Sequence, residues 1–392
     1  MDTWEIITHL GENREEYHGA MIPPMYQTSN FKFDDLSAMQ TALADEYHYP
    51  VYSRGNNPTV KILREKLAAL EGAEDALVFN SGCAAISTLL LSQLKAGDHM
   101  VCIAKPYGWV KYICDYILKA KGIQCSFVEV LDNDAGVYAY IQASNENTRL
   151  WYLESPNTFT FEVTDIAAVA LASKERGIIT VIDNSYSTPL YQKPLLLGID
   201  FVIHSVSKYL AGHSDVVAGV LCGNSESIKE IYQSYYLALG AVISPQDAWL
   251  IIRGLRTLPL RLEQSSKSAL EILTAIEHHP RIEKIYYPFH HSHPNYEIAK
   301  LQMKSCSGLF SIKLKVDNTE AIHRFCDAFK VFSMAVSWGG FESLIFPALA
   351  FQVKDETDQN ALSWKIVRFY VGFEEVEVLK NDLLQALAVI NS

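Results

Sequence analysis

The apolar positions of the chain follow two alternating patterns from about residue 58 onward. Short apolar runs, which predict buried strands, occur at residues 76–79, 99–104, 125–130, 150–153, 178–182 and 201–204. Segments of helical length and pattern lie between them, for example at residues 82–95 and 164–176. This alternation predicts an α/β fold with a mainly parallel sheet flanked by helices. Ligands of such sheets bind at the carboxyl ends of the strands.

The clearest helix signal follows a poorly patterned N-terminal segment. Asn57 is suited to cap a helix, Pro58 suits its first turn, and apolar residues recur on one face up to Leu70 before Gly72 ends it. Residues 1–57 contain turn formers and little periodicity. We therefore expect them to form an extended arm that contacts a neighbouring subunit.

The pattern changes near residue 245. A long helical stretch is interrupted at Pro259, and strand-like runs follow at residues 309–315, 331–336 and 367–371. Helical segments at 319–330 and 374–390 complete a smaller C-terminal α/β domain. The chain is thus divided into the arm (1–57), a large domain (58–245) and a C-terminal domain (246–392).

Charge and cysteine content narrow the class of partner. A formal net charge of −12 argues against binding to nucleic acid or to an acidic membrane, and favours a small-molecule substrate. The N-terminus lacks the basic and apolar regions of a secretory signal, so a cytoplasmic location is expected. The seven cysteines are scattered and contain no Cys-x-x-Cys pair. They predict neither a disulfide framework nor a metal site.

A lysine in the most informative segment is a candidate for Schiff-base chemistry. The apolar run 201–204 leads into Ser205, Ser207 and Lys208, and then into a turn rich in glycine, histidine and serine. A Schiff-base lysine needs a partly buried neutral amine, with hydroxyl donors nearby for a phosphate. The structural alternative is a lysine that lies along the strand end with its ammonium group in water.

Two further segments carry candidate polar groups at strand ends. Asp183 ends the run 178–182, where a carboxylate is costly unless it meets a cation such as a protonated pyridine nitrogen. It could equally cap a helix. Ser81 and Gly82 follow another strand and begin a helix, where amide and hydroxyl donors suit a phosphate, although Ser-Gly before a helix is often only a turn.

The segment from Ser205 to Asp215 matches Ser/Ala-x-Ser/Thr-Lys-Tyr-x-x-Gly-His-Ser-Asp, the lysine motif of the Cys/Met-metabolism family of pyridoxal 5′-phosphate (PLP) enzymes. The chain resembles this family from about Gly19 to Leu387. The resemblance implies the fold type I PLP-dependent transferase fold, aspartate aminotransferase-like. It also implies PLP in the large domain and a homo-oligomer, built from dimers with shared active sites and expected to be a tetramer.

The resemblance also implies a role for each matching residue. Lys208 would bind PLP and act as the base, Asp183 would pair with the ring nitrogen, and Tyr107 would stack on the ring. The phosphate would be held by Ser81, Gly82, Ser205 and Ser207 from one subunit and by Tyr52 and Arg54 from its neighbour. Tyr52 and Tyr107 would also take part in catalysis. Arg368 would bind the substrate carboxylate, a task suited to its planar fork.

Departures from the family pattern bear on the reaction. Many members have Ser-Leu where this chain has Ser337 and Trp338, and the Ser-Trp pair is similar to that of the bacterial cystathionine β-lyases. Val336 stands where γ-synthases and γ-lyases carry a glutamate. Asn157 lies one position before the asparagine that usually contacts the ring hydroxyl in this family. Whether Asn157 takes over that contact is left open by the sequence. Residues 52–59 instead follow the γ-type pattern.

The expected reaction is therefore β-elimination by a cystathionine β-lyase-like C–S lyase. The alternatives are γ-elimination or γ-replacement, of the cystathionine γ-synthase, methionine γ-lyase or O-acetylhomoserine sulfhydrylase type. A biosynthetic PLP enzyme with an unusual substrate, or a PLP-binding protein without turnover, is a further alternative. Fold and cofactor do not distinguish among these.

Overall fold

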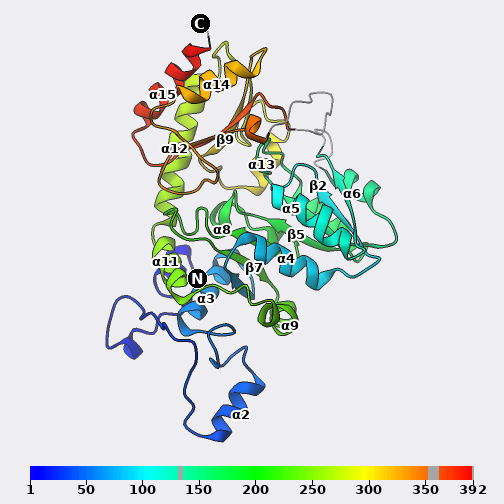
Figure 1. Ribbon diagram of the computed structural model, residues 1–392, viewed down its shortest axis with the longest axis vertical. Helices are drawn as coiled ribbons and strands as arrows, with labels where there is room; N and C mark the ends of the chain where they lie inside the picture. Colours follow the sequence, from blue (N-terminus) through cyan, green and yellow to red (C-terminus); the bar gives the residue numbers. More distant parts are fainter. Residues whose placement is uncertain (131–135, 352–361, 391–392) are drawn as a thin grey trace.

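Two sheets organise the chain in the computed structural model, which describes residues 1–130, 136–351 and 362–390 (Figure 1). The larger sheet has the order β1-β7-β6-β5-β4-β2-β3, and the smaller has the order β10-β11-β12-β9-β8. The strands of the larger sheet are β1 (Asp75–Phe79), β2 (His99–Ile103), β3 (Gln124–Val128), β4 (Thr148–Glu154), β5 (Ile179–Asp183), β6 (Phe201–Ser205) and β7 (Gly219–Gly223). The strands of the smaller sheet are β8 (Ile282–Tyr286), β9 (Leu309–Leu314), β10 (Ser333–Met334), β11 (Leu344–Pro347) and β12 (Ile366–Tyr370).

The larger sheet confirms the predicted α/β class. Strands β3, β2, β4, β5 and β6 run parallel, whereas β7 is antiparallel to both of its neighbours, β1 and β6. The six predicted strands of this sheet are present. Strand β7 was not predicted, because all five of its residues are buried and glycines bound it, so its short run shows no alternation.

Apolar side chains cover both faces of the larger sheet. In β1, Ala76 and Val78 belong to one buried cluster, whereas Leu77 and Phe79 belong to another on the opposite face. This two-sided burial explains why the strands appear in the sequence as continuous apolar runs. The first cluster continues into the smaller sheet, where it includes residues such as Phe310.

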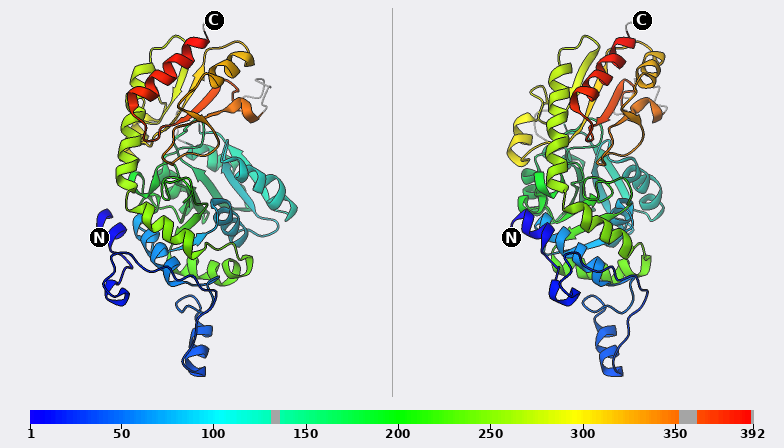
Figure 2. Two further views of the ribbon diagram at one scale, coloured as in Figure 1. Left: turned by 60° about the vertical axis from the view of Figure 1, so that its left-hand side comes forward. Right: turned by 90° about the vertical axis from the view of Figure 1, so that its left-hand side faces the viewer.

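Helices pack around both sheets, and a long one connects them. The helices are α1 (Thr3–Thr8), α2 (Leu36–Ala44), α3 (Pro58–Glu71), α4 (Gly82–Gln93), α5 (Gly108–Tyr112), α6 (Val137–Ala143), α7 (Ile166–Lys174), α8 (Thr188–Tyr191), α9 (Ser225–Ile231), α10 (Leu237–Leu239), α11 (Pro245–Leu255), α12 (Leu258–Ile276), α13 (Tyr296–Gln302), α14 (Thr319–Asp327) and α15 (Val376–Val389). Helix α12 runs from the level of the larger sheet to that of the smaller (Figures 1 and 2). Among the described residues, no helix is long and apolar enough to span a membrane.

Helix α3 forms as its sequence signals predict. Asn57 Oδ1 accepts a hydrogen bond from Thr59 N at 3.0 Å, and Pro58 occupies the first turn. Gly72 ends the helix with a φ of +82°, a left-handed conformation that glycine adopts without strain. The break at Pro259 separates α11 from α12, because proline starts a helix more readily than it continues one.

The N-terminal arm and the smaller sheet differ from expectation. The arm contains helices α1 and α2, whose first turns are capped by Asp2 and Asp35, each accepting a backbone hydrogen bond at 2.8 Å. These capping signals outweigh the weak periodicity of the segment. In the smaller sheet, the predicted strand 331–336 is only the two-residue β10, and β8 and β11 were not predicted.

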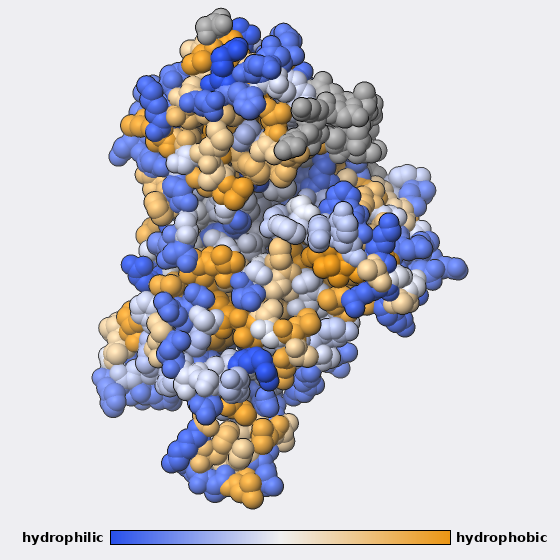
Figure 3. All heavy atoms as spheres, viewed as in Figure 1, coloured by the Kyte–Doolittle hydropathy of each residue, from blue (hydrophilic) through white to orange (hydrophobic). Residues whose placement is uncertain are grey.

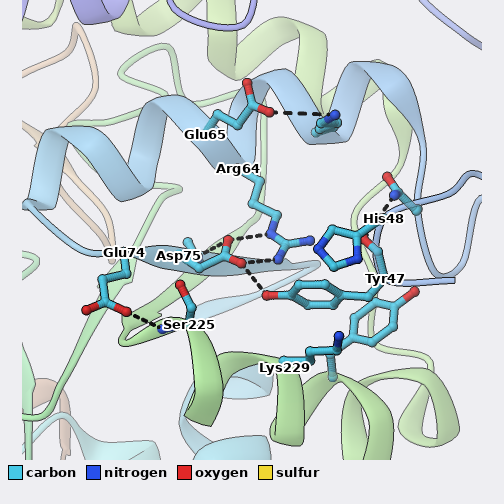
Figure 4. A network of polar contacts seen from close by, with 12 residues as sticks. Tyr47, His48, Arg64, Glu65, Glu74, Asp75, Ser225 and Lys229 are labelled. Carbon is cyan, nitrogen blue, oxygen red and sulfur yellow. Dashed lines mark hydrogen bonds and ion pairs between the residues drawn. The ribbon is translucent and has the colours of Figure 1, made fainter. Parts of the chain in front are cut away.

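A polar network fixes the end of the arm on the body of the protein (Figure 4). The Tyr47 hydroxyl donates to Asp75 at the start of β1, and Arg64 Nε donates to the same carboxylate at 2.7 Å. The Arg64 guanidinium lies 4.2 Å from the centre of the Tyr47 ring. The start of the arm is also anchored, because Glu12 forms buried ion pairs with Lys66 at 3.1 Å and Arg256 at 3.0 Å. Helix α2 instead projects away from the rest of the chain (Figure 2).

Candidate active site

Three neighbouring parallel strands end in polar residues at one edge of the larger sheet. Glu154 ends β4, Asp183 ends β5 and Ser205 ends β6, and Glu154 pairs with Asp183 in the strand register. Because the carboxyl ends of parallel strands meet at the same edge, these side chains gather where such sheets bind ligands.

The N-terminus of α4 lies beside the same edge. Ser81 Oγ caps the helix by accepting from Ala84 N at 3.1 Å. A Cβ atom on Gly82 would lie 3.4 Å from Ser205 Cα, and one on Gly219 would lie 2.4 Å from the Ser81 carbonyl oxygen. Glycines at these positions let the helix start approach the ends of β6 and β7 closely. Free amide groups and a hydroxyl at this turn are suited to an anion.

Lys208 lies in the turn after β6 and reaches across to a loop of the smaller sheet. Its amine donates a hydrogen bond to Ser337 Oγ and lies 5.5 Å from the centre of the Trp338 indole ring. Burial lowers the pKa of this amine to about 8, and the nearby Arg368 guanidinium acts in the same direction. A lysine with such a pKa is neutral in a large fraction of molecules at mildly alkaline pH, as a nucleophile requires.

Asp183 is a buried carboxylate beside this lysine. It accepts a hydrogen bond from Ser185 N at 2.9 Å, and it takes part in no ion pair among the described residues. Burial raises its pKa, while the hydrogen bonds from Ser185 and the charges of His204 and Lys208 oppose that change. The site therefore contains a carboxylate whose ionised form lacks a directly bonded cation.

Tyr107 follows β2 and is held in place through its backbone. Its amide donates to Glu154 Oε2 at 2.7 Å, and its hydroxyl lies 3.9 Å from Cys83 Sγ. Its side chain is 40% exposed, so the ring borders open space.

Burial, and next the Asp183 charge, raise the pKa of Glu154 to about 8. Two adjacent carboxyl groups at the ends of β4 and β5 thus disfavour each other's ionisation.

Arg368 projects from β12 of the smaller sheet. Its Nη1 donates to Thr158 Oγ1 at 2.9 Å and to the Thr158 carbonyl at 3.2 Å, and its Nη2 donates to the Ser337 carbonyl at 3.4 Å. The guanidinium lies 4.7 Å from the centre of the Phe159 ring and 5.2 Å from that of Phe346. Burial lowers its pKa to about 10, so it remains a cation at neutral pH.

The segment 336–339 brings the smaller sheet against Lys208. Ser337 has a left-handed φ of +82°, an uncommon conformation for a residue other than glycine. A Cβ atom on Gly339 would lie 2.7 Å from Tyr209 N, so this segment packs directly on the lysine turn. Trp338 packs against the Tyr209 ring at 5.3 Å between centroids, whereas Val336 is 69% exposed.

The groups at this site fit PLP. The Lys208 amine, whose pKa burial lowers to about 8, suits a Schiff-base partner. The Asp183 carboxylate has no directly bonded cation and suits a protonated ring nitrogen, and the turn at the start of α4 suits a phosphate. Asn157 is fully buried. Its Oδ1 accepts hydrogen bonds from Thr160 Oγ1 and from Glu162 N, both at 3.1 Å, whereas its Nδ2 donor has no hydrogen-bond partner. An unused buried donor of this kind is suited to a ring oxygen.

Three of the predicted site residues do not offer a polar group to this site: Ser207, Tyr52 and Arg54. The Ser207 hydroxyl donates to the Ala218 carbonyl at 3.1 Å and accepts from Ala218 N at 2.9 Å, so its contacts serve the turn itself. Tyr52 and Arg54 lie exposed in the arm, where Tyr52 forms a β-bridge with Asn30. No contact joins them to Lys208 within the described part of the chain.

Four residues at the site were not assigned a role from the sequence: Cys83, Glu154, Thr158 and Ser185. Glu154 carried the same signal as Asp183, a carboxylate directly after a buried apolar run. Thr158 carried none, because its role depends on a hydrogen bond from Arg368, which is 210 residues away in the chain. Ser185 carried none, because its contact with Asp183 is made by its backbone amide, which any residue type has.

Comparisons with known proteins agree with this site. The family model described as "Cys/Met metabolism PLP-dependent enzyme" matches residues 5–388. The chain is 38% identical over 388 residues to an L-methionine gamma-lyase from Fusobacterium nucleatum subsp. polymorphum, and 36% identical over 385 residues to a cystathionine beta-lyase from Lactococcus lactis subsp. cremoris, with 97% of each chain covered in both cases.

A solved structure gives the same result. The cystathionine gamma-lyase from Lactobacillus plantarum, complexed with L-serine, superposes with a TM-score of 0.91 at 32% identity, covering 100% of both chains. A family model that spans nearly the whole chain, together with relatives of equal length, leaves one assignment. The chain belongs to the Cys/Met metabolism family of PLP-dependent enzymes, and its cofactor is pyridoxal 5′-phosphate.

Proposed function

We propose that the protein is a C–S lyase that cleaves L-cystathionine by β-elimination. The observation that carries this proposal is the convergence of two cationic side chains on one residue. Lys208 donates to Ser337 Oγ, and Arg368 donates to the Ser337 carbonyl at 3.4 Å. An α-amino acid whose carboxylate binds Arg368 therefore has its Cα close to the Lys208 amine, where a proton is to be removed.

PLP supplies an electron sink for the negative charge that develops at the substrate Cα. Lys208 would hold its aldehyde carbon and Asp183 its ring nitrogen, Ser81 and Gly82 would bind its phosphate, and Asn157 Nδ2 would donate to its ring oxygen. Asp183 stays ionised against the cation of the ring, because a buried carboxylate is stabilised by a paired positive charge.

The protein side chains then move one proton and bind one leaving group. The neutral Lys208 amine accepts the Cα proton, the Cβ–S bond breaks, and the departing sulfur takes up that proton to leave as the thiol of homocysteine. Water releases the remaining three carbons as pyruvate and ammonia. Tyr107 borders this path, and the Glu154 hydrogen bond to its backbone fixes its position.

Val336 supports β-elimination in this proposal because it stands where the γ-synthases and γ-lyases of the family carry a glutamate. It is exposed, next to Ser337. The alternative is γ-elimination of L-methionine, which releases methanethiol and 2-oxobutyrate. That alternative is favoured by the γ-type pattern of residues 52–59 and by the methionine gamma-lyases among the relatives. A γ-replacement reaction is the third possibility.

The reaction is tested with purified enzyme and a panel of amino acids. Cystathionine, methionine, homocysteine and O-acylhomoserines are supplied in turn, and pyruvate and 2-oxobutyrate are quantified separately. We expect pyruvate from cystathionine to dominate. A larger kcat/KM for 2-oxobutyrate release from methionine would overturn β-elimination and support the alternative.

Val336→Glu tests the substrate contact separately from the chemistry. A carboxylate at this position can pair with the distal ammonium of cystathionine, whereas methionine has no such group. The ratio of kcat/KM for cystathionine to that for methionine is expected to rise. An unchanged ratio would mean that residue 336 does not face the distal end of the substrate. Val378→Glu, at an exposed valine on α15, is the control.

We also propose that each active site is shared between two subunits, with Tyr52 and Arg54 reaching the phosphate of the neighbour. The support is the arm's surface, where hydrophobic residues gather on the projecting segment at the bottom of Figure 3. Exposed large hydrophobic side chains of the arm are Met21, Leu36, Leu43, Tyr49 and Tyr52. Apolar surface of this extent on a projecting segment indicates a protein interface. A tetramer and a cytoplasmic location stay predictions.

Mixing two inactive variants tests the shared site. Lys208→Ala and Arg54→Ala subunits are unfolded together and refolded, so that about half of the dimers are mixed. If Arg54 serves the neighbour, each mixed dimer contains one intact site, and about a quarter of wild-type activity returns. If Arg54 serves its own subunit, every site retains a lesion and no activity returns.

A further inference from the structure

A cluster of two histidines and a glutamate joins the end of α12 to the loop after β8. Glu277 is the C-cap residue of α12, and His290 and His291 lie between β8 and α13. His290 Nε2 is 3.6 Å from Glu277 Oε2, and His291 Nε2 is 3.7 Å from the same oxygen. One ligand atom from each residue lies within 4.8 Å of the other two. The cluster shares no residue with the active site.

These separations match the coordination shell of a small divalent cation. Tetrahedral zinc binds histidine nitrogen and carboxylate oxygen at roughly 2.0–2.2 Å, which places neighbouring ligand atoms roughly 3.3–3.5 Å apart. The two histidine-to-carboxylate distances, 3.6 and 3.7 Å, exceed that spacing by only a few tenths of an ångström. Small side-chain rotations are sufficient to close the shell.

The buried histidine supplies a second and independent observation. The His290 side chain is only 12% exposed, and its Nε2 is buried without a hydrogen-bond partner. Its other ring nitrogen, Nδ1, lies 2.7 Å from Ser292 Oγ and accepts a hydrogen bond from Ser292 N at 3.4 Å, and these two contacts hold the ring in position. Metal-binding histidines typically have this arrangement, with one nitrogen bonded to an outer partner and the other directed at the metal.

An ordinary ion pair explains the cluster less well. Neither histidine is within hydrogen-bonding distance of the Glu277 carboxylate, so a protonated ring would gain little from this geometry. The two rings also lie close together, with 4.3 Å between centroids and 32° between their planes, which is unfavourable if both are charged. A cation between the three ligand atoms accounts for both features.

We propose that Glu277, His290 and His291 bind a divalent cation of the zinc class. Two imidazoles and one carboxylate suit Zn²⁺, and also Ni²⁺ or Cu²⁺, more than Mg²⁺ or Ca²⁺, which prefer oxygen ligands. The fourth position is taken by water or by His278, whose Nε2 lies 3.4 Å from Glu277 Oε1. The ion ties the C-terminal end of α12 to the loop after β8, and its effect is on stability.

Zinc alone serves as the probe. The holoenzyme is treated with a chelator, passed through gel filtration and titrated with zinc chloride in a calorimeter, and its melting temperature is measured with and without zinc. We expect one tight site per chain and a higher melting temperature when it is filled, because a ligand that binds only the folded state stabilises it.

Variants locate the site. His291 is 76% exposed, so His291→Gln is expected to fold normally. It should weaken zinc binding by at least about tenfold, the loss that removal of even an outer-shell partner causes. His323→Gln, an exposed histidine on α14, is the matched control and should bind zinc as wild type does. His290→Gln should abolish the melting-temperature increase.

The outcomes are distinct. Loss of the tight site in His291→Gln, with wild-type binding in His323→Gln and unchanged lyase activity in both, supports the proposal. Equal zinc affinity in wild type and His291→Gln overturns it, as does a wild-type enzyme that binds no zinc in the micromolar range. Neither of these results depends on which substrate the active site accepts.

Discussion

Replacing Asp183 with asparagine is expected to change the stability of the apoenzyme and its affinity for PLP in opposite directions. Asparagine has nearly the same volume, and its Oδ1 can still accept the hydrogen bond that Ser185 N donates at 2.9 Å. The substitution removes only the negative charge at the end of β5. The packing of the strand end is therefore preserved.

The magnitude follows from the surroundings of this carboxylate. In the holoenzyme, loss of one partner of a buried charged pair costs roughly 3–5 kcal/mol, or a hundredfold or more in an equilibrium or rate constant. In the apoenzyme, burial raises the pKa of Asp183. Its folded pKa lies above its unfolded pKa, so the ionised group lowers stability as the pH rises through the folded value. Removing that charge should stabilise the apoenzyme by on the order of 1 kcal/mol.

The assay measures both effects at pH 8. PLP is removed, the melting temperature of the apoenzyme is determined, and PLP is titrated back while its absorbance is followed. Asp183→Asn should melt higher than wild type without PLP, bind PLP more weakly and turn over at least a hundredfold more slowly. A variant with near-normal PLP affinity and turnover would show that Asp183 is not the partner of the ring.

A carboxylate at the opposite edge of the same sheet provides the control. Asp200 accepts hydrogen bonds from Thr180 N and Thr180 Oγ1, both at 2.8 Å. Asp200→Asn makes the same chemical change where no cofactor group is expected. It should leave PLP affinity unchanged and, at most, lower the melting temperature.

Three further predictions concern the lysine, the arginine and the arm. The pKa of the Lys208 amine is lowered to about 8, so PLP capture by the apoenzyme, trapped with borohydride on the Lys208 peptide, should accelerate with pH up to about 8 and then level off. A rate that still rises at pH ~10, near the ordinary lysine pKa, would contradict this. Arg368→Lys removes the planar fork that binds Thr158 and, as proposed, the substrate carboxylate, so kcat/KM should fall by roughly tenfold to a hundredfold while PLP affinity stays unchanged. An equal loss of PLP affinity would assign Arg368 a structural role. Tyr47→Phe removes the hydroxyl that donates to Asp75, and urea unfolding should show a loss of about 1 kcal/mol. Wild-type stability would mean that this contact does not anchor the arm.

Local signals in the sequence determined the elements of the larger domain. Six of the seven strands of the large sheet and the limits of α3 follow from apolar runs and from Asn57, Pro58 and Gly72, because capping and turn preferences act within a few residues. Strand β7 escaped prediction, since its short buried run has no periodicity. The predicted strand at 331–336 is present only as the two-residue, exposed β10. The helices of the arm were missed because their signal was a capping aspartate rather than an apolar face.

The sequence also determined which residues carry the chemistry. Lys208 and Asp183 were recognisable because a lysine and a carboxylate placed directly after buried strands are costly without a ligand. The motif around Lys208 then indicated the family, which the comparisons confirm. These inferences need only the order of residues along the chain.

Only the tertiary structure decided how these groups act on one another. Three contacts join segments that are far apart in the chain. They are the hydrogen bond from Lys208 to Ser337, the hydrogen bond from Arg368 to Thr158, and the strand pairing of Glu154 with Asp183. The lowered pKa of Lys208 and the raised pKa of Glu154 result from burial and neighbouring charges, which no local pattern encodes. Folding sets these distances, and at such sites distance determines both charge and reactivity.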